Sequence, residues 1–335
     1  MTLEGVLGPN NRLEEARAIR VASPDALSVG ADGRLFLSSG RSVLSLRKWG
    51  EAPQAFTEFE RPVTALASSK GGALAVGLLG GGLTVCDGSG RALPGWKQPP
   101  GLKSAADAAF LSEDELAIAD HGYGPAEPLL SVAPWDDAGR GQLVVARRDA
   151  DARVLAGGLN CPMGVSLDER GAPIVTEFER ARIVDMSGRV RQAGYPGYLG
   201  RLRKTAEGYL LVCLSRRDPL IEFLKTEPGF VDAMKATIAP ELWIGPRVNP
   251  EFAHDFPIEL GATRLFGEIK PWAPSFSYGL MIELSDALTP VASAHSRADG
   301  RRHAISDALV WNGDLIAVSR ASGELLNMGC ARGRP

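Results

Sequence analysis

Six ionisable side chains lie at comparable positions of a repeated sequence pattern, although they come from distant parts of the chain. They are Asp25, Asp107, His121, Glu177, Arg201 and Asp307. Carboxylates and an imidazole can transfer protons, and a guanidinium can stabilise negative charge that develops during a reaction. Charges inside a narrow channel are costly unless they are paired. The set therefore predicts either a ligand pocket or an ion-pair network that plugs a channel, and Arg201 with Asp25 or Asp107 is the expected pair.

The pattern that aligns these residues is Gly-x-hydrophobic-x-hydrophobic, with one copy in which Asp replaces Gly. Its six copies begin at Gly33, Gly72, Asp114, Gly171, Gly208 and Gly313. Each copy follows an apolar run and a polar turn, which is typical of a tight hairpin between two strands. A unit that recurs roughly every 40 residues favours a propeller. We expect an all-β, six-bladed β-propeller that forms a single domain over residues 1–335.

The apolar run before each turn is expected to be the first strand of a blade and to line the central channel. These runs are 24–30, 62–69, 104–112, 162–168, 199–205 and 304–311. The second strand returns antiparallel, so the start of each first strand and the end of each second strand meet at one mouth. Weaker segments are expected to supply the third and fourth strands of each blade, and residues 2–20 a strand or cover that helps to close the ring.

Two insertions interrupt the repeat. Residues 122–141 are rich in Pro and Gly and predict a long loop on the third blade. Residues 216–276, in the fifth blade, combine a helical pattern over 219–239 with an aromatic and proline-rich stretch. Long loops on a propeller often cover one end of its channel. We expect this insertion to be a lid over the mouth, and a packing or dimer role is the alternative.

Composition excludes several classes of function. A net charge of −3 without a basic stripe argues against a nucleic-acid-binding protein. No apolar run approaches the roughly 20 residues that span a bilayer, and the N-terminus lacks the features of a signal peptide. We therefore expect a cytoplasmic protein with no membrane or nucleic-acid partner. The sequence leaves its oligomeric state open.

The sequence leaves the roles of the four cysteines open, and also those of His295 and His303 near the C-terminus. Cys86, Cys161, Cys213 and Cys330 form no metal-binding spacing and are expected to be buried apolar side chains, with a catalytic thiol at Cys161 as the alternative. His303 lies near the channel entry of its strand. It is expected to be either a hydrogen-bonded structural residue or part of the site.

Several stretches resemble the strictosidine synthase-like proteins, relatives of the gluconolactonase, senescence-marker and paraoxonase propellers. They are Ser23-Pro24-Asp25-Ala26-Leu27, Met163-Gly164-Val165 followed by Glu177 and Arg182-Ile183, Gly197-Tyr198-Leu199-Gly200-Arg201, Ser215-Arg216-Arg217-Asp218-Pro219-Leu220, and Tyr278-Gly279-Leu280 followed by His295. The likeness covers roughly residues 20–328. It implies a six-bladed propeller with its site at the channel mouth.

The residues that the resemblance places in the site differ from the family pattern. Metal-dependent relatives hold calcium with a Glu and Asn side chains at positions that are Asp25, Met163 and Arg201 in this chain. A thioether and a permanent cation do not coordinate calcium, so we expect no metal and no cofactor. The resemblance also places the catalytic Glu of the plant synthase at the position of Ser306, and Asp307 beside it is expected to face the other side of its strand.

These observations favour a metal-independent enzyme that acts on a small organic molecule, a lactonase- or esterase-like hydrolase in the first instance. A carbon–carbon bond-forming or cyclising enzyme and a non-catalytic binding propeller are the alternatives. The expected catalytic residues are Asp25, Arg201 and Asp307. The expected substrate-binding residues are Asp107, His121, Met163, Glu177, Tyr198, His303 and Ser306.

Overall fold

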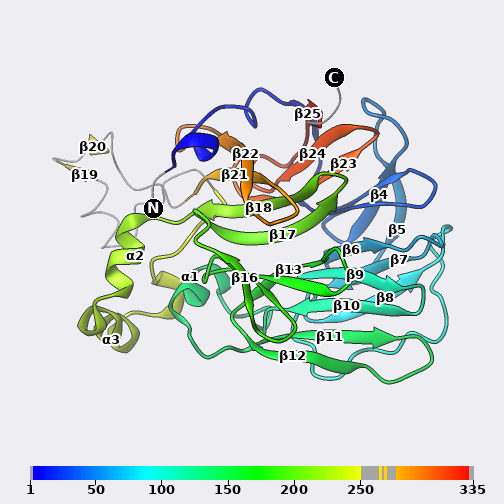
Figure 1. Ribbon diagram of the computed structural model, residues 1–335, viewed down its shortest axis with the longest axis horizontal. Helices are drawn as coiled ribbons and strands as arrows, with labels where there is room; N and C mark the ends of the chain where they lie inside the picture. Colours follow the sequence, from blue (N-terminus) through cyan, green and yellow to red (C-terminus); the bar gives the residue numbers. More distant parts are fainter. Residues whose placement is uncertain (1–2, 250–263, 266–267, 270–276, 332–335) are drawn as a thin grey trace.

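The computed structural model describes residues 3–249, 264–265, 268–269 and 277–331 and contains six antiparallel sheets arranged in a ring (Figure 1). The six-bladed β-propeller expected from the sequence is therefore confirmed. The first strands of successive sheets contact one another around the axis, and the last of them, β23, returns to the first, β2. Turn glycines such as Gly33 and Gly72 adopt φ angles of 79° and 94°, which the tight hairpins require.

The strands of the first three sheets follow one another from the axis outward. They are β2 (Pro24–Val29), β3 (Leu35–Ser39), β4 (Ser42–Leu46) and β5 (Gln54–Glu58); β6 (Val63–Ser68), β7 (Leu74–Leu78) and β8 (Gly82–Cys86); β9 (Asp107–Ser112), β10 (Glu115–Asp120), β11 (Gly141–Arg147) and β12 (Arg153–Leu159). The second sheet has three strands, so the expectation of four strands in every blade was wrong there.

The sheets of the other three blades each have four strands. They are β13 (Pro162–Leu167), β14 (Pro173–Glu177), β15 (Arg182–Asp185) and β16 (Val190–Ala193); β17 (Gly197–Thr205), β18 (Gly208–Arg216), β21 (Gly279–Leu284) and β22 (Pro290–Ser296); β23 (Ile305–Trp311), β24 (Asp314–Ser319), β25 (Glu324–Cys330) and β1 (Arg17–Arg20). The N-terminal strand β1 pairs with β25, so the two ends of the chain close the ring in one sheet.

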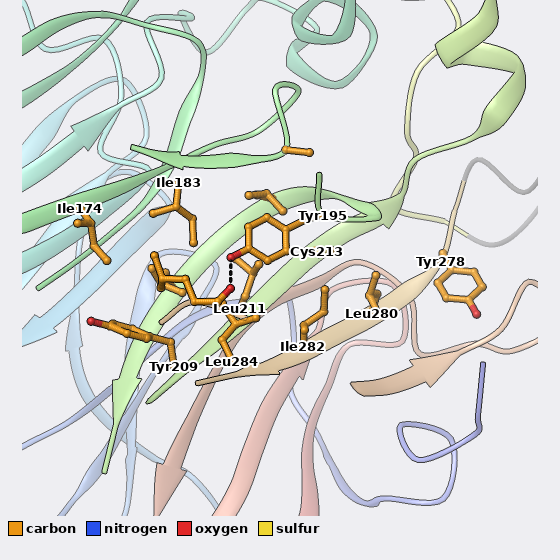
Figure 2. Packing of buried hydrophobic residues seen from close by; sticks show 14 residues of the cluster. Ile174, Ile183, Tyr195, Tyr209, Leu211, Cys213, Tyr278, Leu280, Ile282 and Leu284 are labelled. Atoms are coloured by element: carbon orange, nitrogen blue, oxygen red, sulfur yellow. Dashed lines mark hydrogen bonds between the residues drawn. The ribbon is translucent and has the colours of Figure 1, made fainter. Parts of the chain in front are cut away.

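The blades are held together by apolar side chains that alternate along their strands. Figure 2 shows the packing between the fourth and fifth sheets, in a cluster that includes Ile183 of β15 and Leu280 and Ile282 of β21. The Tyr195 hydroxyl donates a hydrogen bond of 2.7 Å to the carbonyl of Leu288 within this cluster. Full burial of each such aliphatic side chain stabilises the fold by about 1.5–3 kcal/mol.

Both insertions leave from the ends of second strands, and described residues of each line a cavity next to the channel mouth. The third-blade insertion, after β10, contains α1 (Leu129–Val132) and η2 (Ala133–Trp135). The fifth-blade insertion, between β18 and β21, contains α2 (Pro219–Lys225), α3 (Pro228–Thr237), η3 (Pro240–Leu242), β19 (Arg264–Leu265) and β20 (Glu268–Ile269). Figure 1 shows α1, α2 and α3 together on the left.

The helical pattern expected over 219–239 forms two helices because Pro228 begins a new one. A short 3-10 helix, η1 (Gly5–Leu7), precedes β1. Among the described residues, no helix has both the length and the apolar character needed to cross a membrane. Cys86, Cys161 and Cys213 are buried as expected, whereas Cys330 is exposed.

Candidate functional site

A cavity of about 200 Å³ lies at the mouth of the central channel. Its walls come from the starts of first strands and the ends of second strands, as the repeat predicted. The lining residues are Asp25, Thr64, Leu79, Ala106, His121, Leu129, Met163, Phe178, Leu199, Gly200, Arg201, Leu214, Ile305, Ser306 and Arg320. Most of these side chains are apolar, so charged groups in the cavity act on a ligand from a weakly polarisable environment.

Arg201 places its guanidinium on the axis and joins four blades. Its Nη1 donates hydrogen bonds to the carbonyl oxygens of Ser306 (2.8 Å) and Asp25 (3.2 Å) and to the Asp25 carboxylate (3.5 Å). Its Nη2 donates to the other Asp25 carboxylate oxygen (3.3 Å), to the carbonyl of Ala106 (3.1 Å) and to the carbonyl of Thr64. The guanidinium therefore contacts six oxygen atoms, and the side chain is 6% exposed.

A second arginine lies on the same face of β17, two residues along, and forms a deeper layer of the network. Arg203 makes two hydrogen bonds of 2.8 Å to Asp107 and one of 2.8 Å to Asp307. Both carboxylates are fully buried, and Arg201 Nε lies 3.5 Å from Asp107 and 3.8 Å from Asp307. The backbone N–H of Leu27 also donates to Asp307 (2.9 Å). The expected ion-pair network therefore exists, below the cavity.

Asp25 connects this network to the cavity. Its side chain is 22% exposed, and Arg320 Nε lies 3.9 Å from its carboxylate. Burial would raise the pKa of Asp25, but the charges of Arg201 and Arg320, with the hydrogen bonds of Arg201 and Ser306, together lower that pKa below its usual value. Asp25 is therefore ionised at neutral pH and is a weak base.

His121 supplies a neutral imidazole to the same cavity. Burial lowers its pKa to about 4, although the carboxylates of Asp120 and Glu127 act in the opposite direction. The backbone N–H of Tyr123 donates to His121 Nδ1 (3.1 Å), which assigns the ring proton to Nε2. His121 therefore offers a hydrogen-bond donor at Nε2, which suits the stabilisation of negative charge better than proton abstraction.

The other residues predicted from the sequence divide into two groups. Met163 and Ser306 line the cavity, and the Ser306 hydroxyl donates to the Asp25 carbonyl (2.7 Å). Glu177 does not line it, because its carboxylate accepts hydrogen bonds from Arg182 and from the backbone N–H of Asn160 (2.7 Å).

Two aromatic candidates also lie outside the cavity wall. Tyr198 packs against Phe178, with 5.1 Å between the ring centroids, and only Phe178 of the two lines the cavity. His303 is buried and hydrogen-bonded to Ser277 (2.8 Å) and to the carbonyl of Arg297 (2.7 Å). The structural interpretation of His303 therefore fits its surroundings. Burial also raises the pKa of Cys161 well above its usual value, so that side chain is a thiol rather than a thiolate.

Sequence reasoning missed Arg320, which follows the last residue of β24. Its side chain is 43% exposed and lines the cavity beside Asp25. The repeat contained the signal, because the ends of second strands were expected at the mouth and Arg320 lies one position beyond Ser319. Phe178, one position beyond the end of β14, was missed for the same reason.

A second cavity, of about 550 Å³, lies next to the first and is lined by both insertions. Its lining residues are Pro128, Leu129, Leu130, Ser131, Met163, Leu214, Glu241, Trp243, Gly245, Pro246, Arg247, Val248, Asn249 and Arg320. Part of the fifth-blade insertion thus lies beside the mouth. The aromatic residues after position 249 that were expected to supply a wall lie outside the described residues.

The axial residues do not fit a metal ion. The guanidinium of Arg201 already contacts the oxygen atoms that a cation on the axis would use, and a permanent positive charge repels a second cation. The thioether of Met163 is no ligand for calcium. Within the described part of the chain, no three His, Cys, Asp or Glu side chains form a group that could hold a metal ion.

The fold is similar to that of solved structures. A gluconolactonase from Xanthomonas campestris, described as important in glucose secondary metabolic pathways, matches with a TM-score of 0.55 and 13% sequence identity over 96% of this chain and 92% of its own. A chain of a nidogen/laminin complex matches with a TM-score of 0.45 and 13% identity over 57% of this chain and 72% of that chain. No protein-family model and no curated protein sequence matches the chain.

Proposed function

We propose that the protein is a lactonase- or esterase-like hydrolase that uses the axial cavity and needs no metal ion. The observation that carries this proposal is the ionised carboxylate of Asp25 between two guanidinium groups, Arg201 and Arg320, in a mostly apolar cavity. The gluconolactonase of similar fold supports the choice of reaction class, since that enzyme acts on a lactone. The narrower resemblance to strictosidine synthase-like proteins stays a prediction.

The proposed reaction begins with a water molecule that attacks the substrate carbonyl carbon while Asp25 accepts a proton from that water. The carbonyl oxygen becomes an oxyanion, and Arg320 with His121 Nε2–H stabilises its charge. The carbon–oxygen bond to the leaving group then breaks, and the proton passes from Asp25 to the leaving oxygen. A low pKa makes Asp25 a weak base but a strong acid, so it favours this second transfer.

Arg201 has a different role from the one expected. Both of its terminal nitrogens donate to protein oxygens, and its Nε has no hydrogen-bond partner among the described residues but lies 3.5 Å from Asp107. Arg201 therefore fixes Asp25 and contributes positive potential, while Arg320 is the guanidinium that can approach a substrate. Asp307, fully buried below the cavity, belongs to the supporting network in this proposal.

The test is the pair of variants Asp25→Asn and Asp168→Asn, assayed on a panel of lactones and esters with and without EDTA. Asp168 is the matched control because it also loses a carboxylate paired with an arginine, Arg191 at 3.3 Å, at the opposite end of its blade. Asp25→Asn should lower kcat/KM by about 10²–10⁴-fold, as expected for loss of a general base. Wild-type rates in Asp25→Asn, or loss of activity with EDTA, would overturn the proposal.

A binding propeller without chemistry is the second candidate. The observation that favours it is the saturation of Arg201, whose terminal donors all face the protein and leave the axis as a structural plug. Calorimetry on compounds from the same panel separates the two cases, because binding without turnover supports the second candidate alone.

A further inference from the structure

The axial cavity and the outer cavity are neighbours, and the side chains between them line both. They share four lining residues, which are Leu129, Met163, Leu214 and Arg320. The first three are apolar, and Arg320 stands beside Asp25. A ligand whose reacting group lies at Asp25 can therefore extend past these residues into the larger space.

The outer cavity is formed by two insertions that are fixed to each other. Trp135 Nε1 donates to the carbonyl of Ile244 (2.6 Å), and Lys235 Nζ donates to the carbonyl of Trp135 (2.7 Å). Gly245 packs so closely that a Cβ there would lie 2.1 Å from the carbonyl oxygen of Leu130. This part of the wall is thus preformed by contacts between the third and fifth blades, which favours binding because less ordering accompanies it.

The chemistry of the walls selects an apolar ligand. The outer cavity has a mainly hydrophobic lining, although Ser131, Glu241, Arg247, Asn249 and Arg320 also contribute to it; its apolar residues include Pro128, Leu130, Trp243, Pro246 and Val248. Trp243 is held in place because its Nε1 donates to the carbonyl of Ile238 (2.8 Å).

The two hydroxyl side chains that line the inner cavity already donate to backbone carbonyls, so Asp25, Arg320 and His121 are the groups left there for the hydroxyls of a sugar. The Thr64 hydroxyl already donates to the carbonyl of Ala105 (2.9 Å) and the Ser306 hydroxyl to that of Asp25 (2.7 Å). Each hydroxyl buried without a hydrogen bond costs about 1–3 kcal/mol. A polyhydroxylated lactone therefore fits these walls poorly.

We infer that the outer cavity binds an alkyl chain or apolar ring of the substrate, and that the substrate class is a hydrophobic lactone or ester. This inference rests on the proposed function for the reacting group at Asp25. Burial of one methylene contributes about 0.8 kcal/mol, which corresponds to roughly a fourfold gain in kcat/KM. The gain should continue with each added carbon until the cavity is filled.

The experiment measures kcat/KM for p-nitrophenyl esters from acetate to decanoate, and for γ-lactones with alkyl substituents of matching length. Val248→Glu places a charge in the outer cavity and should flatten the dependence on chain length. Val154→Glu is the matched control, because Val154 is 58% exposed on the outermost strand of the third blade and should keep the wild-type dependence. A wild-type dependence in Val248→Glu, or a flat one in the native protein, overturns the inference.

A binding measurement separates this inference from the proposed reaction. Octanoate and butanoate are titrated while tryptophan fluorescence is followed, with Trp243→Phe identifying the signal of the outer cavity. Tighter binding of octanoate without any hydrolysis supports the apolar site and overturns the proposed function. Hydrolysis that does not depend on chain length supports the proposed function and overturns the apolar site. If the protein shows neither hydrolysis nor octanoate binding, both are overturned.

Discussion

Removal of the Arg201 guanidinium should destabilise the fold and create a cation site on the axis. In Arg201→Ala the carboxylate of Asp25 and the backbone carbonyls of Ser306, Thr64 and Ala106 lose the hydrogen bonds of the guanidinium, and the buried Asp107 and Asp307 keep Arg203 as their one paired cation among the described residues. Loss of one partner of a buried ion pair costs about 3–5 kcal/mol. The entropy of unfolding is about 2.1 cal/mol/K per residue, so this loss corresponds to a decrease in Tm of about 4–7 °C.

The six oxygen atoms that contact the guanidinium explain why a bound cation should restore the Tm that Arg201→Ala loses. They are two carboxylate oxygens and four carbonyl oxygens, from Asp25, Thr64, Ala106 and Ser306. Calcium binds six to eight oxygen ligands of these types. We therefore expect millimolar CaCl2, and separately a low concentration of guanidinium chloride, to raise the Tm of Arg201→Ala while leaving that of the native protein unchanged.

The assay is thermal unfolding followed by circular dichroism, with choline chloride at the same ionic strength as the salt control. Arg180→Ala is the matched variant, since Arg180 is 40% exposed and pairs with Asp137 at 2.6 Å on the surface, while its other partner, the buried Glu179 at 3.5 Å, keeps Lys225. An exposed pair contributes about 0–1 kcal/mol, so this variant should unfold close to the native protein. If Arg201→Ala behaves like Arg180→Ala, or if calcium raises the Tm of all three proteins equally, the axial guanidinium does not hold the blades together.

Two other predictions concern stability. Burial lowers the pKa of His295 to about 4, against about 6.5 in an unfolded chain, so the unfolded state binds more protons between these values and stability falls as the pH drops from 6.5 to 4. In His295→Gln, denaturant unfolding should show a pH slope smaller by up to about 1.4 kcal/mol per pH unit, and an unchanged slope would contradict this assignment. Leu13 is fully buried next to the strands that close the ring, so Leu13→Ala should lower the free energy of unfolding in urea by about 2–5 kcal/mol. Val6 is 51% exposed, so Val6→Ala should change that free energy by less than about 0.5 kcal/mol. Equal effects of the two substitutions would show that the N-terminal segment does not close the ring.

The repeat was sufficient to predict the blades because each hairpin is a local structure. Its glycine turn and its alternating apolar residues lie within about ten residues of each other, and the register follows from the turn. The same counting brought Asp25, Arg201 and Ser306 to one mouth. The missing fourth strand of the second blade had no comparable signal, because the residues after Cys86 carry turn chemistry that the repeat does not constrain.

Spacing alone could not predict which of the charged residues line the cavity and which form the buried ion pairs. Asp25, Asp107 and Asp307 all lie near the start of a first strand, yet only Asp25 lines the cavity. The difference arises from Arg203, two residues after Arg201 on the same face of β17, which draws two carboxylates below the cavity. Side-chain length and donor geometry decide this, and neither is visible in a repeat pattern.

The sequence also did not predict that the Arg201 guanidinium contacts four other blades. A guanidinium exposed in a pocket would be dispensable for folding, whereas one with contacts to four blades is part of the core of the ring. Arg320 is the residue that combines a positive charge with exposure at the site.

The charges around the axis are compatible with a role of Asp25 in both the fold and the proposed reaction. Three carboxylates, Asp25, Asp107 and Asp307, face three guanidinium groups, those of Arg201, Arg203 and Arg320. The two fully buried carboxylates accept three hydrogen bonds from the terminal nitrogens of Arg203, and Asp25 has two further guanidinium groups beside it. In the proposed reaction, the partly exposed Arg320 turns from Asp25 to the substrate oxyanion while Arg201 still pairs with Asp25.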